Sequence, residues 1–271
     1  MKKNGSIGVV GLGSVGMALK HVLSFYHECY GYDIDGRGNW EDILGAAVVL
    51  VCVDTPEGKN KRLDCSNVDN VLERLLESNY SGVVAIKSTV RVGYMDFAIQ
   101  KFRNLRIVYF PEFLREKSTL QWTVNPDRLV LAGNADDVST VLSYFEWVES
   151  AKNIVVSFRD AELGKLAHNA FIATKVTFAN EMERISLELG ADPEKVLEIV
   201  WSDRRVGSSE HLKPYRGAYG GKCVPKDSDE LETAGDSKFL GMISSMNDAF
   251  ACSTSIGESA LSRKRRVRQS E

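Results

Sequence analysis

Residues 6–16 read SIGVVGLGSVG, and this stretch decides the fold of the chain. Residues 6–10 are mostly apolar and predict a short strand, which passes directly into the spacing Gly11-x-Gly13-x-x-Gly16 and then into a helix-compatible segment. Glycines at these positions permit a tight turn and the close approach of a pyrophosphate, while the free N–H groups at the helix start face its negative charge. The stretch therefore predicts a dinucleotide-binding site.

A carboxylate at the end of the next strand supports this interpretation. Residues 29–32 predict a second strand, which ends in Asp33 about 20 residues after Gly11, where an acid accepts hydrogen bonds from ribose hydroxyls. Because a carboxylate here repels the 2′-phosphate of NADP, the sequence predicts NAD as the cofactor. Arg37 is the competing feature, since an arginine can accept that phosphate.

Strand and helix patterns alternate along the first half of the chain. Apolar runs predict further strands at residues 47–53, 83–87, 105–109, 128–132 and 153–157, and helices are predicted at residues 67–78, 93–102 and 135–148. Repeated strand–helix units predict an α/β fold with a Rossmann-like, doubly wound and mostly parallel sheet. We expect this NAD-binding domain to span residues 1–158.

Polar or helix-breaking residues follow three of the predicted strands. They are Asp54-Thr55-Pro56, Ser88-Thr89 and Pro111-Glu112. Because ligands of such sheets bind beyond the carboxyl ends of the strands, we expect the three clusters to face one cleft. Residues 111–116, PEFLRE, carry the carboxylates Glu112 and Glu116, either of which acts as a base or is an ordinary acid at a helix start.

After residue 158 the pattern changes to one long helix, residues 160–189. Glu162, Lys165 and Asn169 share one face of it by their i, i+3 and i+4 spacing. Either Lys165 and Asn169 reach the oxygens of a substrate, or Lys165 extends from the edge of a core helix into water. His168 lies off this face and is expected to be a packing or surface residue.

This helix opens a smaller, all-helical domain over residues 159–262. Gly190 is expected to end it and Pro193 to start another helix, with a loop over residues 202–221. The long helix carries more apolar positions than one small domain could cover, so we expect a homodimer built on it. Those positions include Leu163, Leu166, Ile172, Phe178 and Leu187. The basic residues 263–271 are expected to form a disordered tail.

Residues 218–229, AYGGKCVPKDSD, place an isolated cysteine in a distinctive setting. Gly220 and Gly221 remove side-chain bulk just before Cys223, so a ligand can approach the sulfur closely. A helix starting at this point, with Lys226 nearby, puts the thiol in positive potential and favours the thiolate. The alternative is a glycine turn, a helix start and a buried, structural cysteine.

The composition of the 271 residues is that of an ordinary globular protein, with 44% hydrophobic and 26% charged residues and a net charge of −3. This charge gives no indication of nucleic-acid binding. The five cysteines never form a Cys-x-x-Cys pair, so we expect neither disulfides nor a metal site, and we expect a reducing, cytoplasmic setting. No apolar run approaches the length of a membrane span, so we expect no membrane association.

Seven motifs occur together and in order: GLGSVG, Thr55-Pro56, KSTV at 87–90, FPEFLRE at 110–116, the helix ELGKLAHNAFIATKVTFANE at 162–181, DRRVG at 203–207 and GGKCVPKD at 220–227. This set closely resembles the UDP-glucose/GDP-mannose dehydrogenase family of nucleotide-sugar dehydrogenases. The match covers about residues 6–235.

The resemblance implies roles for individual residues. Cys223 is the nucleophile, Lys165, Asn169 and Asp227 serve the reacting sugar carbon, and Thr89 and Glu112 hold or activate water. NAD would contact Gly11, Gly13, Ser14, Val15, Gly16, Asp33, Thr55, Ser88, Thr89, Glu116 and Lys226. The nucleotide-sugar substrate would contact Phe113, Leu114, Lys213, Tyr219, Gly220 and, from the partner subunit of a dimer, Arg205.

The implied reaction is the NAD-dependent four-electron oxidation of a nucleotide-diphosphate sugar, with UDP-glucose to UDP-glucuronate as the nearest case and GDP-mannose as the alternative substrate. A two-electron hydroxyacid dehydrogenase also has a Rossmann domain, a long helix and a Lys/Asn pair spaced by four, but its chemistry has no use for Cys223. A third hypothesis is a catalytically impaired dinucleotide-binding relative.

Two departures from the family pattern are expected to matter. Family members carry a third, C-terminal nucleotide-binding domain, which we expect this chain to lack, and the connection over residues 34–46 is short. Without an enclosing domain, we expect the substrate to be held through its sugar and diphosphate, with weak discrimination between bases.

Overall fold

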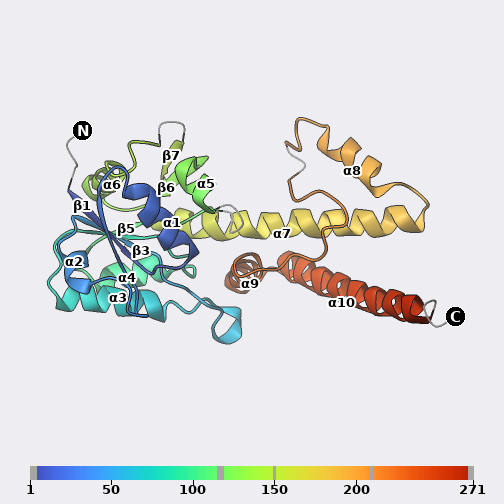
Figure 1. Cartoon of the computed structure of the whole chain (residues 1–271), viewed down its shortest axis with the longest axis horizontal. Coiled ribbons are helices and arrows are strands. Elements are labelled where there is room, and N and C mark those ends of the chain that lie inside the picture. The colour runs from blue at the N-terminus through green and yellow to red at the C-terminus, as the bar shows by residue number, and fades with distance from the viewer. Residues whose placement is uncertain (1–4, 115–118, 149–150, 208–209, 268–271) are drawn as a thin grey trace. The chain divides into compact units, whose positions relative to one another are not determined.

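The computed structural model describes residues 5–114, 119–148, 151–207 and 210–267, with side chains through residue 252 (Figure 1). Its strands are β1 (Ser6–Val10), β2 (Glu28–Tyr32), β3 (Val48–Val51), β4 (Val83–Ile86), β5 (Arg106–Tyr109), β6 (Arg128–Leu131) and β7 (Lys152–Val155). Its helices are α1 (Ser14–Leu23), α2 (Trp40–Leu44), α3 (Ser66–Glu77), α4 (Tyr94–Lys101), α5 (Thr119–Val124), α6 (Ala135–Leu142), α7 (Phe158–Glu188), α8 (Pro193–Trp201), α9 (Val224–Gly235) and α10 (Lys238–Val267).

The chain divides into two compact units, Met1–Lys165 and Leu166–Glu271. The division falls within α7, whereas the sequence predicts a domain boundary between residues 158 and 159. Each unit is described separately below.

The first unit is built on a five-stranded sheet with the order β2-β1-β3-β4-β5. Neighbouring strands are parallel throughout, and Ile7 of β1 pairs with Cys29 of β2 on one side and with Val48 of β3 on the other. The chain order reverses at β1, and in open parallel sheets ligands bind beyond the strand ends at such a reversal. The predicted α/β class with a Rossmann-like, doubly wound parallel sheet is confirmed.

The last two strands of this unit form a parallel pair of their own, β6-β7. One antiparallel bridge, Tyr109 with Ala132, joins them to the edge of the larger sheet through N–H···O bonds of 2.8 and 2.9 Å. The bridge is antiparallel, so β6 meets β5 in the opposite direction and the parallel ladder stops there.

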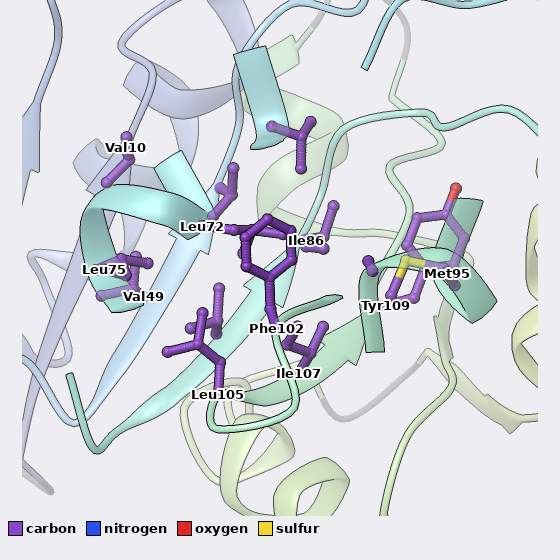
Figure 2. Packing of buried hydrophobic residues seen from close by; sticks show 14 of the residues in the cluster. Val10, Val49, Leu72, Leu75, Ile86, Met95, Phe102, Leu105, Ile107 and Tyr109 are labelled. Carbon is purple, nitrogen blue, oxygen red and sulfur yellow. The ribbon is translucent and has the colours of Figure 1, made fainter. Parts of the chain in front are cut away.

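Apolar side chains cover both faces of the five-stranded sheet, because alternate residues of a strand point to opposite faces. On one face, Figure 2 shows Phe102, which follows α4, among Leu72 and Leu75 of α3 and Ile86 of β4. The other face packs against α1 and α6 through a second cluster, which includes Ile7, Leu50, Val108, Leu19 and Val138. These two layers hold the strand ends of the first unit in place.

The short helix α2 lies within residues 34–46, where the sequence predicts only a short connection. Its N-terminus is capped by the Asn39 side chain, which accepts a hydrogen bond of 3.2 Å from the Glu41 backbone N–H. Trp40 and Ile43 are buried and anchor it to the sheet. Helix α5 was likewise not predicted. Helices of five or six residues depend on such tertiary anchors rather than on a sequence periodicity.

Helix α6 ends at Leu142, whereas the sequence predicts a helix as far as residue 148. After Ser143 the backbone changes to bonds three residues back, from Tyr144 to Val141 and from Phe145 to Leu142. Tyr144 and Phe145 are buried, and the Phe145 ring packs edge-on against Phe110 at 5.1 Å. Burial of these rings favours the tighter turns over a continued α-helix.

The second unit comprises the rest of α7 and the helices α8 to α10. Gly190, with φ at +72°, follows the end of α7, and Pro193 begins α8 as predicted, with Asp192 as its N-cap. Helix α10 continues to Val267 and so includes residues 263–267 of the stretch expected to be a disordered tail; residues 268–271 lie outside the described residues. In the described ranges, no helix combines the length and hydropathy needed to span a bilayer.

Candidate active site

The glycine loop connects β1 to α1 with a geometry suited to a bound phosphate. The Gly11 N–H donates to the Tyr32 carbonyl at 2.9 Å, which ties the loop to the end of β2. A Cβ at Gly16 would collide with the Gly11 carbonyl oxygen, so only glycine allows the helix to start this close to the turn. Gly13 and Ser14 are exposed at the helix start, where backbone N–H groups attract an anion.

Asp33 lies beside this loop and is already hydrogen-bonded to it. Its Oδ2 accepts from the Leu12 N–H at 2.6 Å, and Arg37 Nη2 lies 3.4 Å from the same oxygen. Arg37 also donates from Nη1 to the Leu12 carbonyl and forms an ion pair with Asp35 at 2.8 Å. The Arg37 guanidinium is therefore paired with two carboxylates, which weakens the attraction that it could exert on a 2′-phosphate.

The three polar clusters after β3, β4 and β5 lie at one edge of the sheet, because these strands are parallel neighbours. The Thr55 hydroxyl donates to the Thr89 carbonyl at 2.6 Å, and the Ser88 hydroxyl donates to the Val53 carbonyl at 2.7 Å. Thr55 and Ser88 are buried and Thr89 is half-buried. The first two hydroxyls thus join neighbouring loops of this edge.

Glu112, at the end of β5, forms an ion pair with Lys87, the residue after β4. Lys87 Nζ lies 2.7 Å from Glu112 Oε2 and 3.7 Å from the centre of the Phe110 ring, and the lysine side chain is only 4% exposed. The other carboxylate oxygen of Glu112 accepts from the Phe113 N–H at 2.8 Å. Sequence reasoning did not single out Lys87. A lysine directly following a buried strand was the available signal.

The part of α7 in the first unit carries two buried charged residues with different surroundings. Glu162 accepts from the backbone N–H groups of Gly93 and Met95, at 2.8 and 2.7 Å, and so caps α4. Burial raises the pKa of Glu162, and these hydrogen bonds oppose that shift. Lys165 is 6% exposed, with Nζ 5.3 Å from the centre of the Phe113 ring. Leu114 is half-buried, and Glu116 lies outside the described residues.

In the second unit, Cys223 is the N-cap residue of α9 and is exposed. Four residues later Asp227, with no exposed surface, accepts from Asn169 Nδ2 at 2.6 Å and from Lys226 Nζ at 2.9 Å. His168 Nδ1 lies 3.1 Å from Asn169 Oδ1, so His168 contacts this group although it lies off the predicted face. A buried carboxylate and a lysine in the first turn of α9, just after the cysteine, therefore lie together with an amide of α7.

The other residues that the resemblance assigns to substrate surround this helix start or lie on loops of the same unit. Tyr219 and the exposed Gly220 lie four and three residues before Cys223, and Lys213 is an exposed loop residue. Arg205 is also exposed, and its guanidinium is paired with Asp203. The sequence did not predict Asn180 and Asn247, whose side-chain amides bond to the loop backbone at Gly217 and Tyr219.

Burial separates the cysteines into two kinds. Burial raises the pKa of the Cys29 thiol to about 11 and that of Cys52 to about 12, so both stay protonated and unreactive at neutral pH. Cys223 and Cys252 are exposed. Among the described residues, no group of three His, Cys, Asp or Glu side chains could hold a metal ion.

A parallel sheet with a glycine loop for a dinucleotide, followed by a helical unit with an exposed cysteine at a helix start, defines a class of dinucleotide-binding proteins. The NAD binding domain of the UDP-glucose/GDP-mannose dehydrogenase family matches residues 39–147, and the central domain of that family matches residues 159–249. The chain therefore belongs to the UDP-glucose/GDP-mannose dehydrogenase family. The prediction of NAD as the cofactor is confirmed by the first of these matches.

Individual members of the family resemble the chain over most of its length. The UDP-glucose 6-dehydrogenase of Streptococcus pneumoniae is 32% identical over 270 residues, which cover 84% of this chain and 68% of the relative. A UDP-glucose 6-dehydrogenase of Bacillus subtilis is 33% identical over 73% of this chain and 47% of its own length. The structure of a UDP-glucose dehydrogenase from Pyrobaculum islandicum superimposes with a TM-score of 0.79 at 26% identity, over 91% of this chain and 68% of that one. The chain thus spans from about half to two thirds of these relatives.

Proposed function

We propose that the chain oxidises a nucleotide-diphosphate sugar, UDP-glucose in the nearest case, to the corresponding uronic acid with two molecules of NAD. The observation that carries this proposal is the exposed Cys223 at the start of α9, directly above the buried Asp227 with its Asn169 and Lys226 partners. A thiol is the group required to hold an aldehyde while a second oxidation occurs, and a two-electron dehydrogenase has no need of one.

NAD, when bound, accepts a hydride in each of the two oxidation steps. The glycine loop fits its pyrophosphate, because the space beside Gly13 is open at the helix start and α1 has no acidic residue in its first turn. The Leu12 N–H donates to Asp33 Oδ2, and the Asp35 N–H donates to Asp33 Oδ1, so the carboxylate is already oriented. Asp33 would accept from the ribose hydroxyls.

Cys223 would add to the aldehyde carbon as the thiolate, and the resulting thiohemiacetal would become a thioester when the second hydride leaves. We assign Lys165 and Asn169 to the developing oxyanion, where each fixed donor contributes about 3 kcal/mol. Asp227 would hold Asn169 and Lys226 in place and take up the proton of the reacting hydroxyl. These side chains have little freedom of orientation, because Lys165, Asn169 and Lys226 are each largely buried.

Water must finally attack the thioester to release the acid and the free thiol. We assign Thr89 and Glu112 to this step, in which Glu112 positions the water and its pairing with Lys87 keeps the carboxylate oriented. Phe113 and Leu114 would contact the sugar through their backbone, together with Lys213, Tyr219 and Gly220. Arg205 would reach the sugar of the partner subunit in a dimer.

Counting NADH released per sugar tests the proposal against its alternatives. With UDP-glucose as the probe and GDP-mannose for comparison, we expect two NADH per sugar consumed and a product heavier by 14 mass units, as an alcohol carbon becomes an acid. One NADH per sugar would indicate a two-electron dehydrogenase, and no NADH despite NAD binding would indicate a relative without turnover. Either result would overturn the proposed reaction.

We further propose that the chain acts as a homodimer through residues 160–189. Large apolar side chains of α7 are exposed, with Phe171 at 63%, Phe178 at 41% and Leu187 at 56% exposure. Phe171 and Phe178 are seven residues apart and so lie on one face, which a second copy would cover.

Sedimentation of the whole chain should give the mass of a dimer at micromolar concentration. Replacing Phe171 and Phe178 together by glutamate is expected to raise the dissociation constant at least about tenfold, as loss of aromatic anchors does at other interfaces. Phe25→Glu is the matched control, because Phe25 is 70% exposed but follows α1. A monomeric parent chain would contradict the prediction.

The five cysteines also bear on where the protein works. In the described part of the chain, none of them is joined to another by a disulfide. Because a reducing compartment keeps thiols in this state, we propose a cytoplasmic location.

A further inference from the structure

A buried asparagine on α10 makes a two-point contact with the loop that carries Cys223. Asn247 Oδ1 accepts from the Tyr219 N–H at 2.8 Å, and Asn247 Nδ2 donates to the Tyr219 carbonyl at 3.2 Å. The Asn247 side chain is 7% exposed. Its amide therefore satisfies both backbone groups of one residue, as a neighbouring strand would do.

The contact is specific to the asparagine side chain. Of the side chains of similar size, only an amide offers both a donor and an acceptor at this spacing, and only that combination matches a backbone N–H and carbonyl. In a largely buried position, loss of either partner leaves a polar group without compensation. Ile243, one turn earlier on α10, is also buried, so Asn247 lies on the packed face of the helix.

A second asparagine holds the same loop two residues earlier. Asn180, on α7 and 2% exposed, donates from Nδ2 to the Gly217 carbonyl at 3.1 Å. Among the described hydrogen bonds, Tyr219 is thus the last residue before Cys223 whose backbone is held by a side-chain amide of a helix. Between Tyr219 and Cys223 lie Gly220, Gly221 and Lys222, and Gly221 has φ at +80°.

Two glycines in succession give the chain wide conformational freedom, so the position of Cys223 depends on how firmly the chain is held on each side of them. On the C-terminal side it is held by α9, which starts at Val224. On the N-terminal side it is held at Tyr219 by Asn247. Helices α9 and α10 pack against each other, so both ends of the short glycine segment are fixed to one frame.

We propose that Asn247 is a positioning residue that holds Cys223 at the start of α9 in the orientation its chemistry requires. A catalytic role for Asn247 rests on the proposed function, whereas its effect on the position of Cys223 does not. A thiol held at a helix start lies against the free N–H groups of the first turn, which favour the thiolate. Release of Tyr219 would let residues 219–222 move and carry the sulfur out of that position.

The test measures the reactivity of Cys223 directly, without substrate or NAD. The full chain is treated with iodoacetamide at neutral pH, and alkylation of Cys223 and Cys252 is followed by mass spectrometry. Cys252 is an internal reference, because it is exposed on α10 of the same chain. We expect Asn247→Ala to lower the ratio of the Cys223 rate to the Cys252 rate at least threefold. Amide exchange of the peptide containing Tyr219 should accelerate at least tenfold, while exchange in α9 stays unchanged.

Matched variants separate positioning from general damage. Asn247→Asp keeps the volume and the acceptor for the Tyr219 N–H but lacks the donor, so its ratio should lie between those of the parent and Asn247→Ala. Ser245 is an exposed α10 residue whose hydroxyl donates to the Gly241 carbonyl within the helix, so Ser245→Ala should leave the ratio within twofold of the parent. If Asn247→Ala does not fold, Asn247→Asp serves as the test, and the proposal requires it to lower the ratio of the Cys223 rate to the Cys252 rate.

A Cys223 to Cys252 ratio within twofold of the parent in both Asn247 variants would overturn the proposal. Where the parent chain oxidises a nucleotide sugar, Asn247→Ala should also lower kcat for acid formation at least tenfold with the KM for NAD within twofold. Failure of the proposed reaction would appear as no NADH in the parent and would leave the alkylation result unaffected. The two hypotheses therefore fail in different measurements.

Discussion

Replacing Cys223 by serine is expected to lower the rate of acid formation from a nucleotide sugar at least about 1,000-fold, the scale on which removal of an enzymatic nucleophile acts. A serine hydroxyl is a weak nucleophile without a general base, whereas a thiol at a helix start supplies a thiolate. The substitution changes one atom at an exposed position, so the fold should remain intact.

NAD binding should be unchanged in this variant, because the residues that would hold the pyrophosphate belong to the first unit and Cys223 to the second. The measurements are acid formation by mass spectrometry and NAD affinity by titration. Cys252→Ser is the matched control, since Cys252 is the other exposed cysteine of the described chain, and it should leave the rate within twofold. Near-parent acid formation by the Cys223→Ser variant would rule out the thioester route.

Replacing Asp227 by alanine is expected to destabilise the second unit by about 3 kcal/mol, more than a hundredfold in its folding equilibrium. Asp227 has no exposed surface and accepts from Asn169 at 2.6 Å and from Lys226 at 2.9 Å. Its removal leaves a buried amide donor without an acceptor, which alone costs about 1–3 kcal/mol. It also removes the counter-charge of a lysine side chain that is 13% exposed.

Urea unfolding followed by circular dichroism measures this loss. Asp227→Asn keeps an acceptor for Asn169 and removes only the charge, so it should cost less than Asp227→Ala. Asp248→Ala, an exposed carboxylate on α10, should change stability by less than about 0.5 kcal/mol, as surface substitutions do. A loss below about 1 kcal/mol for Asp227→Ala would show that this carboxylate contributes little to the packing of α9 on α7.

Several parts of the fold could be predicted from the sequence because their signals act within one or two turns of the chain. The glycine loop and the stop at Gly190 are of this kind, because a residue without a Cβ allows backbone conformations that other residues rarely adopt, and the strand before Asp33 is a short local pattern. Short apolar runs, which alternate with helix patterns along the chain, indicated the five strands of the sheet. By contrast, α2 and α5 have no periodicity long enough to detect, since tertiary contacts stabilise them.

The candidate site follows the same division. Its residue types and their places at strand ends and at the start of α9 could be predicted from local patterns, whereas the partner of each polar side chain could not. Lys87 pairs with Glu112, Glu162 caps α4, and Asn247 holds Tyr219.

The sequence by itself therefore determined the class of fold, the dinucleotide loop and the cysteine at a helix start, because alternating strand and helix patterns indicate the first, and glycines and a proline close together in the chain indicate the other two. Only the tertiary structure decided that Glu162 caps α4, and that Asn247 is tied to the cysteine loop. A buried polar group must find a partner wherever packing places one, and that partner is commonly tens of residues away in the chain.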